Sequence, residues 1–200
     1  AMRLSLVSDR GFTKMTSQED DPDPDFIKIH KKILEETISE ANKQPFFLYL
    51  HYPKIHHSIK KNVFDKYDDF SNKYFENKKN NLRHYDTYLK EATDYLEEIY
   101  LKILDDKLDT NSVILIMADH GMGTGEKIGE RAYGAFCYDY TLRTFGLMKW
   151  PKMIHNTISQ QVRTIDLMPT ILEILEIELD SSYELLDGES LLPLLNGEKT

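Results

Sequence analysis

Asp119 and His120 stand next to each other at the end of the apolar run from Val113 to Ala118. A carboxylate and a neighbouring imidazole can coordinate the same divalent cation. A short apolar run rich in β-branched residues and stopped by Gly121 is typical of a strand buried on both faces of a parallel sheet. Because open α/β sheets bind ligands at the carboxyl ends of their strands, we predict a metal site here. The alternative is that Asp119 caps the next turn and His120 is a satisfied polar residue.

The residues after this turn suit a bound anion. Gly123, Gly125 and Gly129 follow closely, so the backbone can adopt conformations closed to other residues and can pass near an anionic ligand. Lys127 and Arg131 lie in the same stretch, and an arginine can hold two oxygens at once. We expect one of these cations to contact the anion; the alternative is that both face solvent.

An ordered series of motifs between residues 45 and 197 resembles the sulfatase branch of the alkaline phosphatase superfamily. The series comprises Pro45–Tyr52, Ile55–His57, Ser112–Gly121, Gly129–Gly134, Tyr138–Arg143, Ile165–Thr170 and Leu186–Leu192. The resemblance implies an α/β fold, namely an alkaline-phosphatase-like three-layer sandwich with a mostly parallel central sheet. This fold is expected to be truncated at the N-terminus. The substrate that it implies is an anionic sulfate or phosphate ester.

The resemblance also implies roles for individual residues. Asp119 and His120 match the second pair of metal ligands in the family, with His120 standing where many sulfatases carry Asn. A Ca²⁺, Mn²⁺ or Zn²⁺ ion is therefore expected, weakly bound without the remaining ligands. His56 matches a histidine that contacts the sulfate or the leaving-group oxygen, so it is expected to be a general acid or an anion contact. Relatives often carry His or Lys where Ala135 stands, and Lys127 or Arg131 is expected to replace that contact.

The nucleophile motif of the family is missing from these 200 residues. The family carries an Asp pair followed by Cys-x-Pro-x-Arg or Ser-x-Pro-x-Arg, and neither occurs here; Cys137 lacks the Pro and the Arg. We therefore expect the carboxyl-terminal half of a metal-dependent hydrolase of sulfuric or phosphoric esters, inactive as this chain alone. The alternatives are a non-catalytic binding or assembly protein with the sulfatase fold, or a phosphodiesterase or phosphotransferase of the same superfamily.

Helices and strands that would position these residues can be read from the apolar spacing. Residues 1–25 read as a linker or N-terminal arm and residues 26–200 as a partial sulfatase-like α/β domain. Within that domain we expect a helix from Phe26 capped by Asp25, a long helix over 82–107, and a helix near Pro169 capped by Asp166. We expect strands over 46–50, 113–118, 142–149 and 158–162, and a short apolar segment that ends near Gly197.

The composition excludes several classes of protein. The net charge of −9 and the pI near 5.3 argue against a general nucleic-acid binder. The sequence has no apolar run of about 18 residues or more, so we expect no membrane span. The single cysteine, Cys137, indicates a reducing compartment, and we expect a cytoplasmic location. Without the first metal-binding strand of the family, the sheet would keep an exposed edge. This edge predicts a homodimer, a swapped assembly, or a covering role for residues 1–25, with Leu4–Val7 as the substitute strand.

Overall fold

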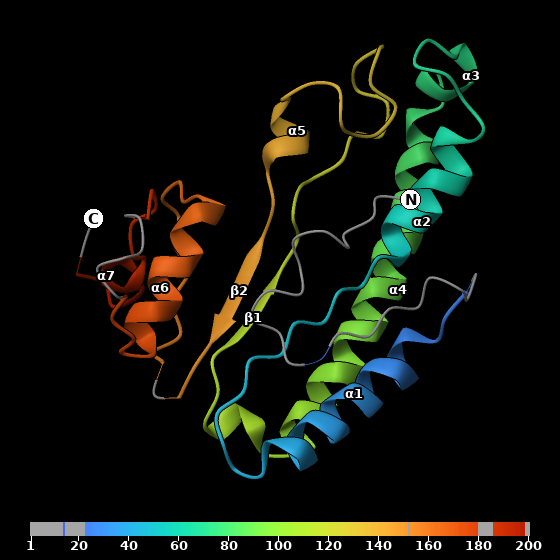
Figure 1. Ribbon diagram of the computed structural model, residues 1–200. Coiled ribbons are helices and arrows are strands. Elements are labelled where there is room, and N and C mark those ends of the chain that lie inside the picture. Colours follow the sequence, from blue (N-terminus) through green and yellow to red (C-terminus); the bar gives the residue numbers. More distant parts are fainter. Residues whose placement is uncertain (1–13, 15–22, 152, 180–185, 199–200) are drawn as a thin grey trace. The chain divides into compact units, whose positions relative to one another are not determined.

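The computed structural model describes residues 14, 23–151, 153–179 and 186–198 (Figure 1). These residues fall into two compact units, one that ends at Tyr52 and one that begins at Pro53. The residues 4–7 that were expected to cover a sheet edge lie outside the described part of the chain. Within that part, no helix is long and apolar enough to cross a lipid bilayer.

The first unit is built around the helix α1, Phe26–Ala41. The predicted cap is confirmed, because the Asp25 carboxylate accepts a hydrogen bond of 3.0 Å from the Lys28 backbone N–H. Phe26, His30 and Leu34 are buried, and their spacing of four residues places them on one face of the helix. Asn42 ends the helix in the left-handed conformation that commonly stops helices.

The strand predicted over residues 46–50 is wrong. This segment has no regular secondary structure, and the side chains of Phe47 and Tyr49 are 74% and 66% exposed. An apolar run is stable as a buried strand only when neighbouring strands satisfy its backbone and a second layer covers its side chains. The described residues supply no strand that pairs with this segment.

The second unit begins with a layer of helices. It comprises α2 (Lys54–Ile59), the π-helical η2 (Lys60–Phe64), α3 (Asn72–Phe75) and α4 (Lys78–Asp105), followed by the 3₁₀ turn η3 (Leu108–Thr110). The predicted long helix is confirmed as α4, which begins four residues before the predicted start. Both α2 and α3 pack on α4.

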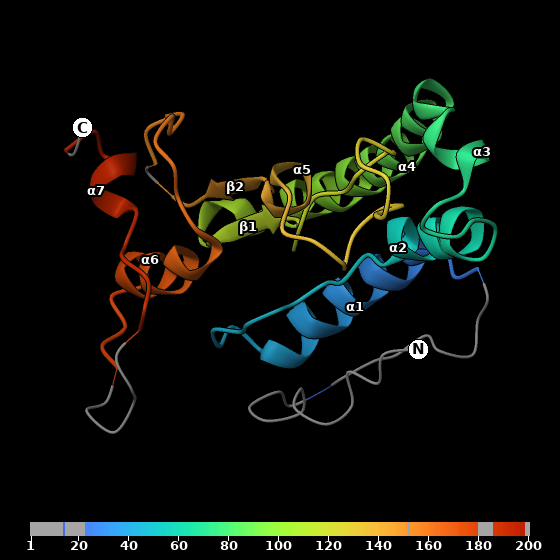
Figure 2. The same cartoon turned by 90° about the horizontal axis from the view of Figure 1, so that it is seen from above.

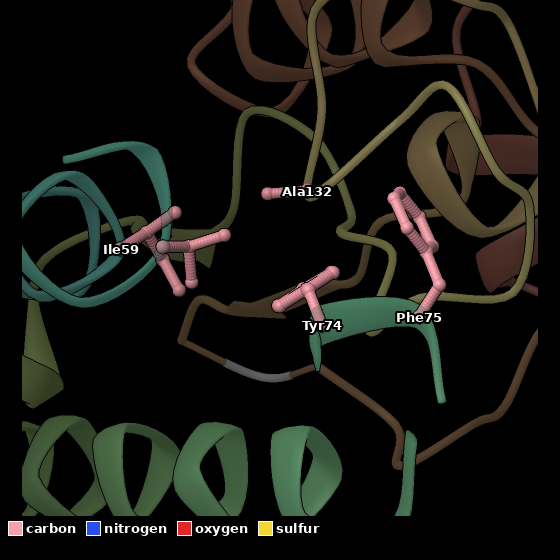
Figure 3. Packing of buried hydrophobic residues seen from close by; sticks show 5 residues of the cluster. Ile59, Tyr74, Phe75 and Ala132 are labelled. Atoms are coloured by element: carbon pink, nitrogen blue, oxygen red, sulfur yellow. The ribbon is translucent and has the colours of Figure 1, made fainter. Parts of the chain in front are cut away.

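A hydrophobic cluster joins this helical layer to the loop after the predicted metal-site turn. Ile59 of α2, Val63 of η2, and Tyr74 and Phe75 of α3 are buried together with Ala132 (Figure 3). Ala132 is completely inaccessible, although it lies in a loop. A buried loop residue fixes the backbone on either side of it, so this cluster positions the residues next to Ala132.

The sheet of the second unit consists of two strands, β1 (Ile114–Met117) and β2 (Gly146–Lys149). They lie side by side in Figures 1 and 2 and pair antiparallel, with Ile114 opposite Lys149 and Met117 opposite Gly146. The strand predicted over 113–118 is thus confirmed, but in the described residues its partner is antiparallel and it is only half-buried. A parallel neighbour requires a crossover connection, whereas β2, which follows β1 after residues 118–145, runs in the opposite direction.

The described residues form a mixed α/β structure with a small sheet, and its strands are fewer and shorter than predicted. Residues 142–145 do not belong to β2, because Leu142 ends the short helix α5 (Asp139–Leu142). Residues 158–162 form no strand.

The last helices are held together by Asp166 and Thr170. They are α6 (Leu167–Ile174), which follows the 3₁₀ turn η4 (Thr164–Asp166), and α7 (Leu192–Leu195). Asp166 occupies the predicted cap position of α6, but its carboxylate binds the Arg163 guanidinium at 2.8 Å and the Glu189 N–H at 3.0 Å. The hydrogen bond from Arg163 lowers the pKa of Asp166. Thr170 accepts a 2.8 Å hydrogen bond from the Leu191 N–H and so ties α6 to the segment before α7.

Candidate active site

The loop between β1 and β2 carries the predicted metal ligands, and a buried carboxylate organises it. Glu130 is 1% exposed and accepts hydrogen bonds from the backbone N–H groups of Ala135 (3.2 Å) and Phe136 (2.9 Å). Its second oxygen accepts a 3.0 Å hydrogen bond from the Tyr140 hydroxyl. Burial, and then this hydrogen bond to Glu130, raise the pKa of Tyr140. One side chain therefore sets the path of the loop from residue 130 to α5.

Arg131 anchors the same loop to the helical layer. Its Nε donates to the Asp69 carboxylate at 2.8 Å, and one terminal nitrogen donates to the backbone carbonyls of Phe64 (3.0 Å) and Tyr67. The guanidinium also lies 5.0 Å from the centre of the Phe64 ring. The hydroxyl of Tyr74 donates back to the Arg131 carbonyl. These contacts give Arg131 a structural role, and its predicted contact with a bound anion stays a prediction.

The turn that carries the metal ligands requires a glycine at position 121. The Gly121 N–H donates to the Thr141 carbonyl at 2.8 Å, which brings the end of α5 against the turn. A Cβ atom on residue 121 would lie 2.5 Å from the Arg143 carbonyl oxygen and still closer to that of Tyr140. Real Cβ atoms essentially never approach backbone oxygens this closely, so a larger residue would push α5 away from Asp119 and His120.

Asp119 and His120 present two donor atoms to the same space. His120 Nδ1 lies 2.7 Å from the Gly121 carbonyl oxygen. Because a carbonyl only accepts, Nδ1 carries the hydrogen, and Nε2 of the neutral ring keeps its lone pair. That Nε2 lies 3.6 Å from Asp119 Oδ2, and the two side chains are 40% and 85% exposed. The other carboxylate oxygen, Oδ1, accepts a 3.0 Å hydrogen bond from the His120 N–H, which fixes the carboxylate.

Tyr133 joins His120 to His56. Its ring centre lies 4.6 Å from that of His120, and its hydroxyl oxygen lies 2.7 Å from Nδ1 of His56 on α2. Burial, and then the negative charge of Asp119, raise the pKa of Tyr133, so the phenol stays protonated at neutral pH. We name His56, Asp119, His120 and Tyr133 the histidine–tyrosine cluster. The structure thus brings together three of the residues predicted from the sequence and adds Tyr133.

The Asp119–His120 pair fits one side of a metal site. The hydrogen bond to Gly121 orients the imidazole as the hydrogen bonds of metal-ligating histidines do, and the carboxylate oxygen beside Nε2 is a suitable second ligand. The described residues contain no group of three or more His, Cys, Asp or Glu side chains that could hold an ion. Two protein ligands alone leave a divalent cation mostly hydrated and weakly bound.

The remaining predicted cation is Lys127, and two residues of the site were not predicted from the sequence. Lys127 is exposed, and no described side chain forms an ion pair with it, so its predicted anion contact stays a prediction. Tyr133 and Glu130 were not predicted as site residues. A tyrosine and a glutamate in a loop show no periodic pattern, and only their contacts in the folded chain reveal what they do.

Comparisons with known proteins identify the family of this chain. The family model described as Sulfatase matches residues 6–177, so the match begins well before residue 45, where the recognisable motifs start. An ulvan-active sulfatase from Formosa agariphila is 32% identical over 113 residues, which are 55% of this chain and 20% of that protein. The chain therefore corresponds to about a fifth of the length of this curated relative.

Solved structures also match. The crystal structure of Ps i-CgsB is 18% identical, with a TM-score of 0.59 over 88% of this chain and 38% of that chain, which indicates a shared fold. A protein solved in complex with its substrate D-glucosamine-2-N,6-O-disulfate is 27% identical over 58% of this chain and 22% of that chain, with a TM-score of 0.35. Because the family model covers most of the chain, this protein belongs to the sulfatase family.

Proposed function

We propose that this chain supplies the metal-binding and anion-binding part of an active site that hydrolyses sulfuric esters, or phosphoric esters of similar shape. The observation that carries the proposal is the histidine–tyrosine cluster. It holds a free imidazole nitrogen 3.6 Å from a carboxylate oxygen and links both to a second histidine through one tyrosine. We propose that the nucleophile and the remaining metal ligands come from a part of the protein outside these 200 residues.

The side chains of the cluster have separate roles in this proposal. Asp119 and His120 would hold a Ca²⁺, Mn²⁺ or Zn²⁺ ion, which when bound polarises the oxygens of the ester. The Tyr133 hydroxyl lies 2.7 Å from Nδ1 of His56, and when it donates this hydrogen bond, the hydrogen of the neutral His56 ring is on Nε2. Nε2–H is then the group of His56 that donates to a sulfate or leaving-group oxygen. Lys127 is the better candidate for a further anion contact, because the guanidinium of Arg131 is already bound to Asp69.

The substrate and the complete fold are also proposals. The name of the ulvan-active relative supports a sulfated polysaccharide as the substrate of the whole protein. The TM-score of 0.59 to Ps i-CgsB supports a larger domain, which we propose to be an alkaline-phosphatase-like three-layer sandwich with a mostly parallel sheet.

A second candidate function is a non-catalytic binding or assembly protein that keeps the sulfatase fold. The observation that favours it is the sequence itself, which lacks the Cys-x-Pro-x-Arg or Ser-x-Pro-x-Arg motif and carries Ala135 in place of an expected His or Lys. The codons upstream of Met2 in the native gene distinguish the two candidates. An in-frame Asp pair and nucleophile motif supports the enzyme, and a genuine start codon supports the binding protein.

The enzyme proposal is tested with the full product of the native gene. Hydrolysis of p-nitrophenyl sulfate and p-nitrophenyl phosphate is measured for the unmodified protein, His120→Ala, His56→Gln and the control His57→Gln. His57 follows His56 on α2, but the Tyr133 hydroxyl bonds to His56 and not to His57, so the His57 variant should keep full activity. Loss of an acid–base group should lower kcat by about 10²- to 10⁴-fold for His56→Gln. Equal activity of the His56 and His57 variants would contradict the assignment of His56.

A further inference from the structure

A pocket of about 470 Å³ lies among η2, α3 and the first turns of α4. Its floor is apolar, because Ile59, Val63 and Tyr74 of the hydrophobic cluster reach it. Figure 1 shows α3 beside the amino-terminal end of α4, which is where the lining side chains come from. Pockets that hold small ligands typically have volumes of roughly 300 to 1,000 Å³, so this one can hold a ligand of one or two rings.

Four asparagines give the pocket walls their polar character. They are Asn62, Asn77, Asn80 and Asn81. The Asn77 side-chain nitrogen donates to the Lys73 carbonyl at 2.7 Å, and that of Asn81 donates to the carbonyls of Tyr74 and Thr124 at 2.8 and 3.0 Å. No described residue donates to the amide oxygens of Asn77 and Asn81. Hydrogen bonds thus fix both side-chain amides, and their oxygens remain as acceptors. Such acceptors suit a ligand rich in hydroxyl groups.

The charge of the pocket is opposite to that of the chain. The chain carries 34 Asp and Glu residues against 25 Lys and Arg residues, a net charge of −9. The described residues that line the pocket nevertheless include no Asp or Glu, whereas Lys66, Lys73 and His84 do line it. Two ammonium groups around a pocket without a carboxylate attract an anionic group on the ligand.

Two half-buried tyrosines add flat apolar surfaces. Tyr85 and Tyr88 lie on the face of α4 that also carries Asn81 and His84. Burial raises the pKa of both phenols, so each hydroxyl stays a hydrogen-bond donor at neutral pH. An aromatic ring with a polar tip can pack against the C–H face of a sugar ring while its hydroxyl binds a ring substituent.

We propose that this pocket binds one sugar ring of an anionic saccharide whose sulfate ester lies at the histidine–tyrosine cluster; this inference rests on the proposed function. The amide acceptors bind hydroxyl groups, the tyrosine rings support the apolar face, and Lys73 binds a sulfate or carboxylate on the same ring. Tyr133 of the histidine–tyrosine cluster packs against the hydrophobic cluster, whose Ile59, Val63 and Tyr74 line the pocket. A saccharide seated in the pocket can therefore continue toward the cluster.

The test is saturation-transfer NMR, which needs no catalytic activity. The 200-residue chain is titrated with a sulfated chondroitin disaccharide, with neutral cellobiose and with inorganic sulfate. The pocket variants are Lys73→Ala and Asn80→Ala, and the matched controls are Lys79→Ala and Asn72→Ala, which change exposed residues outside the pocket lining. Asn81 is left intact because its hydrogen bonds to Tyr74 and Thr124 support the fold.

We expect the sulfated disaccharide to bind more tightly than cellobiose, and Lys73→Ala to weaken its binding about tenfold or more, as the loss of a charge-assisted hydrogen bond does. The measurement follows binding and not turnover, so the result stands even if the full-length protein hydrolyses no ester. Equal binding by Lys73→Ala and Lys79→Ala would overturn the proposal. No binding of the disaccharide at millimolar concentration would overturn it as well.

Discussion

Replacing Glu130 tests whether one buried carboxylate organises the loop that carries the candidate site. Its oxygens accept two backbone hydrogen bonds, from Ala135 and Phe136, and one from the Tyr140 hydroxyl, all at 2.9 to 3.2 Å, and a longer one of 3.5 Å from the Thr141 hydroxyl. Each buried donor left without a partner costs about 1 to 3 kcal/mol, although Ala135 and Phe136 are exposed enough for water to replace part of this loss. We expect Glu130→Ala to lower the free energy of unfolding by about 2 to 4 kcal/mol.

The change to glutamine separates hydrogen bonding from charge. Glu130→Gln keeps one acceptor oxygen and the side-chain volume, and it removes the cost of burying a negative charge that has no cation beside it among the described residues. We therefore expect Glu130→Gln to cost only about 1 kcal/mol. Glu97→Ala is the matched control, because Glu97 is exposed on α4 and alanine is a strong helix former.

Two measurements read out the effect. Urea unfolding followed by circular dichroism gives the change in stability, and amide hydrogen exchange reports on the N–H groups of Ala135 and Phe136 themselves. In Glu130→Ala these two amides should exchange much faster than in the unmodified chain. The reasoning is refuted if Glu130→Ala unfolds at the same urea concentration as Glu97→Ala and both amides keep their protection.

Three further predictions concern activity, pH and assembly. This chain alone should hydrolyse p-nitrophenyl sulfate no faster than buffer, because loss of a nucleophile typically costs on the order of a millionfold in rate; reproducible, chelator-sensitive turnover would contradict this. Burial, and then the charge of His51, lower the pKa of His30 to about 4. The contribution of neutral His30 to the free energy of unfolding is therefore complete above the ordinary histidine pKa of about 6.5, and it is lost as the pH falls toward 4. Stability curves of His30→Gln that keep this pH dependence would show that another group causes it. Sedimentation equilibrium should reveal a dimer formed through an unpaired edge of the sheet, whereas a chain that is monomeric both before and after deletion of residues 2–10, with equal stability, would contradict this.

The elements that can be predicted from the sequence are those whose pattern is local. The helix from Phe26 and its Asp25 cap, and the long helix α4, follow from periodic apolar residues and a short polar cap, and both are confirmed. The apolar run before Asp119 is confirmed as a strand for the same reason. Such patterns depend on neighbours along the chain, so they can be read without knowledge of the tertiary contacts.

The partners of a strand cannot be predicted in this way. Residues 46–50 and 113–118 are both short apolar runs, yet only the second is a strand, because β2 pairs with it. The predicted parallel arrangement depended on neighbours that the described part of the chain does not supply. Pairing is a property of two distant segments, and the composition of one segment does not determine it.

In the candidate site, too, the types of residue could be predicted from the sequence, whereas their contacts could not. Asp119, His120 and His56 could be identified as types of residue that bind metals and anions, and Tyr133 connects them in space. Arg131 and Lys127 looked equivalent in the sequence, as two cations in a glycine-rich loop. The structure separates them, because Arg131 is bound to Asp69 and to the carbonyl of Phe64, while Lys127 is exposed.

The most direct test of the metal site is an NMR titration of the chain with Mn²⁺, whose paramagnetism broadens the signals of nearby nuclei. We predict weak binding, with a Kd well above micromolar, and selective broadening of Asp119, His120 and Gly121, because two ligands leave the ion mostly hydrated. His120→Ala should abolish the broadening, and His57→Ala should leave it unchanged. Micromolar binding that survives His120→Ala, or broadening centred elsewhere in the chain, would contradict the assignment of Asp119 and His120 as metal ligands.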